Sequence, residues 1–275
     1  MFSVKSGLND SAHLTYAGLS MSDTYFLDGF RKLQEGKLAE AVAAFQRAID
    51  DQPRWAEAHY NLGNAYTGLG NYDEAVIAYR EAARLKPDFV QAYTNLGFVY
   101  ARLGDYEKAV ECFKQAIDAQ PDFAEAYVQL GLALIEQEKF AEAVSPLQKA
   151  LGCAPRDGRT CRALGHALLR CGEYSAAVEF LRQAMHLIPE DPESHFHLGM
   201  AFYELGDYAA ASEVLQCVAR LEPSNPKVHF NLALASLAAG KFQEARFRHA
   251  ILETLDAPMA AELSKQIDSL ERKNL

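Results

Sequence analysis

Amide side chains recur in this sequence at intervals of 34 residues or multiples of that spacing. The series, which includes one imidazole, is Asn61, Asn95, Gln129, His197 and Asn231. An amide can donate one hydrogen bond and accept another, so a row of amides can hold an extended polypeptide backbone without reading its sequence. The chemistry indicated by this row is binding rather than catalysis.

Arg162 and His166 form a second candidate group, four residues apart and therefore one helical turn from each other. The residues at the same positions of the neighbouring 34-residue units are Val128, Leu132, Phe196 and Met200, none of which is acidic. An unpaired guanidinium among apolar neighbours predicts an acceptor for an anion, such as a carboxylate of a binding partner. The alternative, that Arg162 only reaches solvent, stays open.

Catalytic and metal-binding sites are not predicted. No Ser/His/Asp set, phosphate-binding glycine loop or paired-carboxylate site stands out, and no cofactor is expected. His59, His195 and His229 share one repeat position with tyrosines of other repeats, so we interpret them as packing residues. The five cysteines are odd in number and have no C-x-x-C spacing, which disfavours disulfides and zinc and fits a reducing cytoplasm.

The charge of the chain limits the classes of partner. Its formal net charge is −10 and its isoelectric point is about 5.3. An acidic chain repels phosphate backbones, so nucleic acid is not an expected partner. No apolar stretch is long enough for insertion into a membrane. Residues 1–21 are predicted to be a poorly ordered leader.

The elements that hold the candidate residues follow from the same spacing. Six prolines are each 34 residues apart: Pro53, Pro87, Pro121, Pro155, Pro189 and Pro223. With repeat position 1 set at Ser22, position 20 is alanine in all seven copies, and position 8 is glycine in the first six. Position 15 is glycine in every copy except the fourth, and position 24 is large in the first six.

Each copy is therefore predicted to form a helical hairpin. Small residues at positions 8 and 20 let two helices approach closely, and the large residue at position 24 fills the remaining space. Glycine at position 15 turns the chain between the helices, and proline at position 32 ends the second helix. One hairpin cannot bury its apolar face alone, so neighbouring copies must stack. The seventh copy departs from the pattern at Ala233, Ser236, Arg246 and His249.

The repeat resembles the tetratricopeptide repeat (TPR). Its clearest copy is AHYNLGNAY, residues 58–66, followed by Tyr72, Asp73, Glu74 and Ala75. The resemblance implies an all-α fold, a right-handed superhelical solenoid of antiparallel helix pairs. The seven repeats are 22–55, 56–89, 90–123, 124–157, 158–191, 192–225 and 226–257. Residues 258–275 carry Met259, Leu263, Ile267 and Leu270 on one face and are predicted to form a capping helix.

The resemblance also implies that the first helix of each pair lines an inner groove. The candidate peptide-binding residues on that face are Phe26, Phe30, Tyr60, Asn61, Asn64, Asn95, Phe98, Gln129, Arg162, His166, Phe196, His197, Met200, Phe230 and Asn231. A similar asparagine ladder lines the TPR groove of the protein O-linked N-acetylglucosamine transferases. Two alternatives stay open, because asparagine is frequent at this TPR position and the rings can pack on neighbouring repeats.

The function predicted from these features is that of a protein–protein interaction scaffold or adaptor, not an enzyme. Its partner is expected to be a protein or peptide, with an acidic group placed near Arg162. One alternative is a peptide-sensing regulatory protein, and another is a non-catalytic TPR subunit of a larger enzyme such as a glycosyltransferase. The oligomeric state is not indicated by the sequence.

Overall fold

The computed structural model describes residues 20–273, so nearly all of the predicted leader (1–21) lies outside the described residues. Within this part of the chain, all regular structure is α-helical. The helices of the described part are α1 (Met21–Gln34), α2 (Leu38–Asp51), α3 (Ala56–Leu69), α4 (Tyr72–Leu85), α5 (Val90–Arg102), α6 (Tyr106–Ala119), α7 (Ala124–Glu136), α8 (Phe140–Cys153), α9 (Gly158–Arg170), α10 (Tyr174–Leu187), α11 (Pro192–Glu204), α12 (Tyr208–Leu221), α13 (Pro226–Ala238), α14 (Phe242–Leu255) and α15 (Ala257–Lys273).

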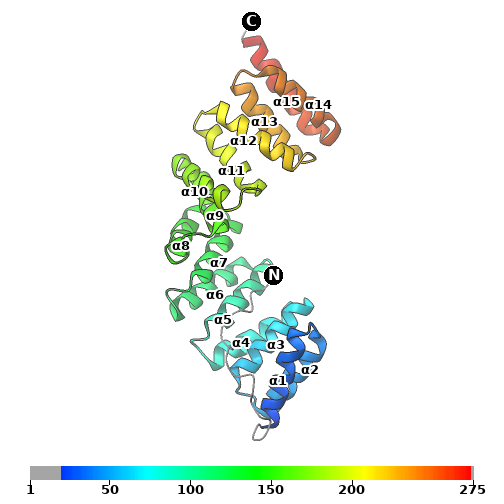
Figure 1. The fold of residues 1–275 in the computed structure, drawn as a ribbon, viewed down its shortest axis with the longest axis vertical. Coiled ribbons are helices and arrows are strands. Elements are labelled where there is room, and N and C mark those ends of the chain that lie inside the picture. The colour runs from blue at the N-terminus through cyan, green and yellow to red at the C-terminus, as the bar shows by residue number, and fades with distance from the viewer. Residues whose placement is uncertain (1–19, 274–275) are drawn as a thin grey trace. The chain divides into compact units, whose positions relative to one another are not determined.

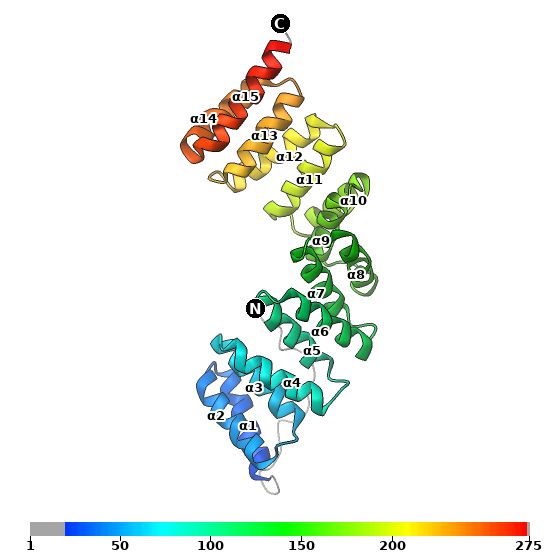
Figure 2. The same ribbon diagram turned by 180° about the vertical axis from the view of Figure 1, so that it is seen from behind.

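The described part of the chain forms two compact units, which divide between residues 105 and 106. The first unit contains α1 to α5 and the second contains α6 to α15. Within each unit, every helix packs on the helix that follows it, and consecutive helices run in opposite directions (Figure 1 and Figure 2). The fold is thus all-α and is built from stacked antiparallel helix pairs, as the sequence predicts.

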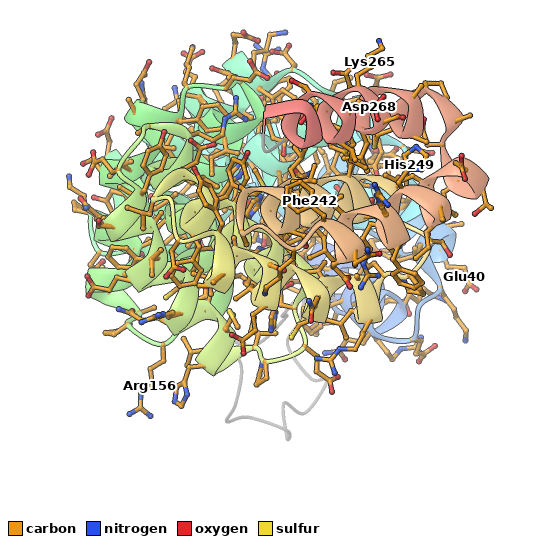
Figure 3. The ribbon with its side chains drawn as sticks, turned by 90° about the horizontal axis from the view of Figure 1, so that it is seen from above. Glu40, Arg156, Phe242, His249, Lys265 and Asp268 are labelled. Carbon is orange, nitrogen blue, oxygen red and sulfur yellow. The ribbon has the colours of Figure 1, made fainter. Side chains whose placement is uncertain are left out.

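The amphipathic pattern separates buried from exposed side chains on these helices. Charged residues of the helices, such as Glu40 of α2 and Lys265 of α15, point outward to solvent (Figure 3). All seven alanines at repeat position 20, from Ala41 to Ala245, are completely buried. Because alanine has the smallest side chain that still favours a helix, it allows two helices to cross closely without a loss of helix propensity.

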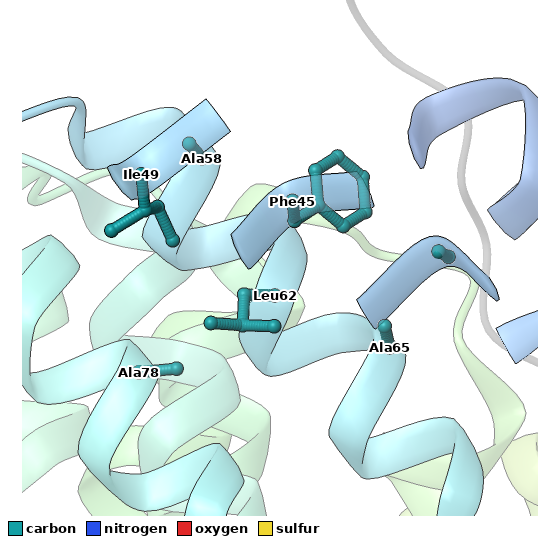
Figure 4. Packing of buried hydrophobic residues seen from close by; sticks show 7 residues of the cluster. Phe45, Ile49, Ala58, Leu62, Ala65 and Ala78 are labelled. Carbon is teal, nitrogen blue, oxygen red and sulfur yellow. The ribbon is translucent and has the colours of Figure 1, made fainter. Parts of the chain in front are cut away.

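The core of the first unit illustrates how the large residues fill the space between the alanines. Phe45 and Ile49 of α2 pack with Leu62 of α3, and alanines of α2, α3 and α4 complete the cluster (Figure 4). Phe45 is completely buried, as is the equivalent Leu147 of the second unit. Position 24 of the repeat is therefore the central filling residue in both units.

The glycines at repeat position 8 lie directly under the large side chains of position 24. A Cβ atom added to Gly165 would lie 2.5 Å from Cγ of Leu181, and one added to Gly63 would lie 2.6 Å from Cε1 of Tyr79. These distances are far below the optimal separation of about 3.5–4.0 Å between non-bonded carbon atoms. The glycine at position 8 and the large side chain at position 24 thus form the two sides of one contact.

Replacing Gly165 with alanine is expected to lower the free energy of unfolding by about 1–3 kcal/mol, because overpacking outweighs the better helix propensity of alanine. Gly152 of α8 is a matched control, because nothing lies within 4 Å of a Cβ added there. Gly152→Ala is expected to raise the free energy of unfolding by about 0.5–1 kcal/mol. Urea denaturation measures both values, and equal gains for the two variants would contradict the close contact at Gly165.

Repeat position 15 adopts a left-handed backbone conformation. The six glycines found there have φ angles between 74° and 82°. The fourth repeat has Glu138 instead, and its φ angle of 57° is also in the left-handed region. A residue with a Cβ atom is strained in this conformation by about 1–2 kcal/mol. The turn between the helices therefore keeps its geometry even where the sequence does not provide glycine.

Glu138→Gly is accordingly expected to raise the free energy of unfolding by about 1 kcal/mol, through release of this strain. The reverse change in the next repeat, Gly172→Ala, is expected to lower it by a similar amount, since Gly172 has a φ angle of 82°. Thermal and urea denaturation measure both changes. A destabilised Glu138→Gly variant would mean that the Glu138 side chain contributes more than its strained backbone costs.

Histidine at repeat position 4 links consecutive repeats. The Nε2 atom of His59 lies 2.9 Å from the carbonyl oxygen of Pro53, and that of His229 lies 2.8 Å from the carbonyl oxygen of Pro223. Each proline follows the end of the preceding helix, where carbonyl groups have no partner within the helix. These histidines therefore combine packing with a hydrogen bond that ties one repeat to the next.

Helix α15 covers the apolar face that α13 and α14 leave open. Leu263 of α15 is completely buried, and it shares a cluster with Ile267, Leu237 of α13 and Leu252 of α14. On the opposite face of α15, the exposed side chains of Lys265 and Asp268 point away from the cluster (Figure 3). The predicted capping helix is confirmed, although the side chain of Leu270 lies outside the described residues.

Candidate functional site

The second unit contains a concavity of about 500 Å³ whose walls come from four successive first helices. Leu132 and Glu136 of α7, Arg162 of α9 and Phe196 of α11 line it, together with residues of α13 and of the turn before α13. We call it the α7–α13 concavity. Four of the predicted groove residues meet there: Arg162, His166, Phe196 and His197.

Aromatic rings form a continuous row beside this concavity. The imidazoles of His166 and His197 are stacked, with centroids 4.2 Å apart and planes only 6° from parallel. Phe140 contacts His166 at a centroid distance of 5.6 Å, and Phe196 contacts His197 at 6.0 Å, both edge to face. The stack joins α9 to α11, so two repeats share one ring surface.

Both stacked imidazoles are held in the neutral form. Burial lowers the pKa of His197 to about 3, with smaller contributions from His166 and Arg162. Burial also lowers the pKa of His166, and the charges of Arg170 and Arg162 act in the same direction. The Nδ1 atom of His197 is buried without a hydrogen-bond partner in the described part of the chain. The ring surface is thus uncharged at neutral pH.

Arg162 is paired, which corrects the interpretation drawn from the sequence. Its Nη1 atom lies 2.8 Å from Oδ1 of Asp191 and 2.9 Å from Oε2 of Glu193. Asp191 is also the N-cap of α11, because its second carboxylate oxygen accepts a hydrogen bond from the backbone of Ser194 at 3.1 Å. The expectation was wrong because it compared only positions 5 and 9 of the repeat, whereas these carboxylates occupy positions 34 and 2.

The other predicted groove residues of the second unit lie along the same first helices. Gln129 donates to the carboxylate of Glu125 at 2.6 Å, and Asn231 donates to the carbonyl oxygen of Lys227 at 2.8 Å. Phe230 is partly buried against the cluster beneath α15, and Met200 is partly buried on α11. These contacts stay within one helix or within the core, so each residue's part in binding stays a prediction.

In the first unit, two of the predicted asparagines form a network with tyrosine. Nδ2 of Asn95 donates to the hydroxyl of Tyr60 at 3.1 Å and to Oδ1 of Asn64 at 2.9 Å. The hydroxyl of Tyr79 donates to the same Oδ1 atom at 2.7 Å. Burial raises the pKa of Tyr60. The network joins α3, α4 and α5, so these amides support the packing of one repeat on the next.

The remaining candidates of the first unit have partners of their own. Asn61 donates through Nδ2 to the carbonyl oxygen of Glu57 at 2.8 Å. The ring of Phe26 stacks on Trp55 with a centroid distance of 4.4 Å, and Phe30 packs against the first-unit core. Phe98 is partly buried on α5. For Asn61, one amide hydrogen remains for a ligand, so its predicted role is still open.

Several residues that line the concavity were missed by the sequence reasoning. The larger ones are Ile135, Glu136, Glu222, Lys227 and Val228. Ile135 and Glu136 stand at repeat positions 12 and 13, and Lys227 stands at position 2, all on the predicted inner face. The charges of Glu136 and Lys227 alternate in sign with those of neighbouring repeats, and this alternation was interpreted as ion pairing between repeats rather than as part of a binding site.

Comparisons with known proteins agree with this arrangement of helices. Residues 5–201 match the family described as the Cilia and flagella-associated protein 70 C-terminal domain, a TPR family. The chain belongs to this TPR family. Residues 170–248 of the TPR protein also match the family described as the Anaphase-promoting complex, cyclosome, subunit 3. The family is one of scaffolds that are typically non-catalytic, and TPR domains in general mediate protein–protein interactions.

Several solved structures share the fold. YrrB, a TPR protein with an unusual peptide-binding site, is 22% identical with a TM-score of 0.62, over 72% of this chain and 98% of its own. MamA from Desulfovibrio magneticus RS-1 is 27% identical with a TM-score of 0.58, over 62% of this chain and 96% of its own. PilF from Pseudomonas aeruginosa is 20% identical with a TM-score of 0.64, over 77% of this chain and 97% of its own.

Among curated proteins, none matches this sequence significantly. Within residues 20–273, no helix of the TPR protein combines the length and the apolar character that crossing a membrane requires.

Proposed function

We propose that this TPR protein is a non-catalytic interaction scaffold whose first helices hold an extended segment of a partner protein. The α7–α13 concavity is the observation that supports this proposal most directly. Its walls come from four successive first helices, so an extended chain that crosses them can contact all four. Leu132 is 38% exposed there, and the ring row beside it offers surface for an apolar side chain.

The predicted amide ladder belongs to the same proposal. Asn61 and Asn231 each bond a carbonyl oxygen of their own helix through one amide hydrogen, which leaves the other hydrogen for a ligand. Such an amide can bond the backbone of a partner segment. Asn64 and Asn95 bond each other, so their main contribution in this proposal is to hold the first helices in place.

A role as a subunit of a larger assembly is a second candidate. The match of residues 170–248 to a subunit family of the Anaphase-promoting complex favours it, as does membership of a family named after a cilium- and flagellum-associated protein. We further propose a cytoplasmic location, because all five cysteines are free thiols, which a reducing compartment maintains.

The proposed binding face can be tested by selecting unstructured peptides from a display library on the whole chain. Their affinities would then be measured by fluorescence anisotropy for Leu132→Arg on α7 and for Phe247→Arg on α14. Phe247 is 56% exposed on α14, which is the second helix of its pair, whereas α7 is the first helix of its pair. The two variants therefore place the same charged residue on the two different faces of the helix pairs. We expect Leu132→Arg to weaken binding by about tenfold or more and Phe247→Arg to leave it unchanged. The reverse result would assign binding to the second helices.

A further inference from the structure

The charge of Arg162 is compensated inside the protein. Its guanidinium bonds Asp191, whose side chain is only 13% exposed, and it also pairs with Glu193. A partner's carboxylate at this point would meet a guanidinium whose single charge two carboxylates already compensate. Repulsion from Asp191 and Glu193 would oppose its attraction to Arg162. The α7–α13 concavity is therefore not suited to an acidic group.

The rim of the concavity carries carboxylates that lack this compensation. Glu136 is exposed, and no ion-pair partner of it is found in the described part of the chain. It is the last residue of α7, where the unpaired carbonyl groups of the helix end add partial negative charge. Glu222 also lines the concavity, and among the described residues its side chain accepts only a neutral hydrogen bond, from Asn225 at 2.7 Å. Against these two carboxylates stands one uncompensated cation of the lining, Lys227.

The ring row that lines the concavity favours an aromatic side chain. The stacked imidazoles of His166 and His197 lie face to face beside Phe196. Burial keeps both imidazoles neutral. Neutral rings attract another ring through stacking and edge-to-face contacts, which add to the gain from burial. A side chain as large as tryptophan also fits within about 500 Å³.

We propose that the α7–α13 concavity recognises an aromatic side chain of an extended partner segment together with an adjacent lysine or arginine, which Glu136 pairs with at the rim. The inference rests on the proposed function and specifies the chemistry of the partner. It reverses the charge expected from the sequence, because Arg162 is already occupied by Asp191 and Glu193.

Three synthetic peptides of about nine residues, glycine and serine except at two central positions, are the probes. The central pairs are Trp-Lys, Trp-Glu and Ser-Lys. With the full chain, we expect the Trp-Lys peptide to bind about tenfold more tightly than either of the others, since a charge-assisted hydrogen bond or a buried ring contributes about that factor. The preference for lysine over glutamate should shrink as salt is added, because the rim is open to water.

Charge reversal separates a specific pair from general attraction to an acidic protein. Glu136→Lys is expected to invert the preference, so that the Trp-Glu peptide binds more tightly than Trp-Lys. Glu179→Lys is the matched control, because Glu179 is exposed on the second helix α10 and the change in net charge is the same. Equal effects of the two variants, or no binding of any probe to the folded chain, would overturn the proposal.

The proposed function can survive a failure of this inference. If display-selected peptides lose affinity on Leu132→Arg but carry acidic or purely aliphatic residues, the binding face is right and the partner chemistry is wrong. If the selected peptides are insensitive to Leu132→Arg, the binding face itself is wrong.

Discussion

Leu263→Asp should release α15 from the rest of the second unit. Leu263 is completely buried between α13 and α14, so the substitution removes apolar contacts and places a carboxylate in a cluster of leucine and isoleucine. Burial of an unpaired charge together with the loss of a leucine side chain is expected to cost about 4 kcal/mol or more. Because α15 is the last element of the stack, its release exposes Leu237 and Leu252 to water.

Hydrogen exchange over residues 257–269 measures the release, and light scattering measures the aggregation that the exposed face promotes. Ala261→Asp is the control, since it introduces the same charge at an exposed position of the same helix. We expect Ala261→Asp to keep both the protection of α15 and the solubility of the wild-type chain. Identical protection in the two variants would mean that α15 contributes little to covering the core.

Replacing His197 with asparagine should make the stability of the second unit less sensitive to acid. The pKa of His197 is lowered from 6.5 to about 3 in the folded chain. Below pH 6.5 the unfolded chain therefore binds a proton that the folded chain does not, and the free energy of unfolding falls as the pH falls. The slope is up to about 1.4 kcal/mol per pH unit, so from pH 6.5 to 4.5 this histidine accounts for a loss of about 2–3 kcal/mol.

Asparagine is the residue at the equivalent position of three other repeats, including Asn61 and Asn231, so His197→Asn is compatible with the fold. Urea denaturation at several pH values is expected to show that the loss between pH 6.5 and 4.5 is about 2–3 kcal/mol smaller in the variant. The ion pair of Arg162 with Asp191 is present in both proteins and cancels in this difference. His186→Asn, on an exposed residue of α10, is the control and should leave the profile unchanged. If the free energy of unfolding depends on pH in the same way for wild type and His197→Asn, the pKa of His197 is the same in the folded and the unfolded chain.

The partners of the candidate site depend on contacts that no local pattern contains. The prediction for Arg162 considered only the residues at equivalent helix positions of the neighbouring repeats. Its partner Asp191 lies 29 residues further along the chain, in the turn before α11. That turn approaches Arg162 only when α9 and α11 stack. The pairing, and with it the charge of the expected ligand, could therefore not be inferred from repeat positions 5 and 9.

The sequence alone determined the helices, the turns between them and the cap, because each depends on residues close together in the repeat. Alanine at position 20, and glycine at position 8 facing a large side chain at position 24, specify one helix crossing, and the 34-residue spacing repeats it. Only the tertiary structure decided that Glu138 keeps a glycine-like turn and that His197 stays neutral. The physical reason is that strain and burial arise from the surrounding repeats, which impose a φ angle on Glu138 and cover most of the His197 side chain.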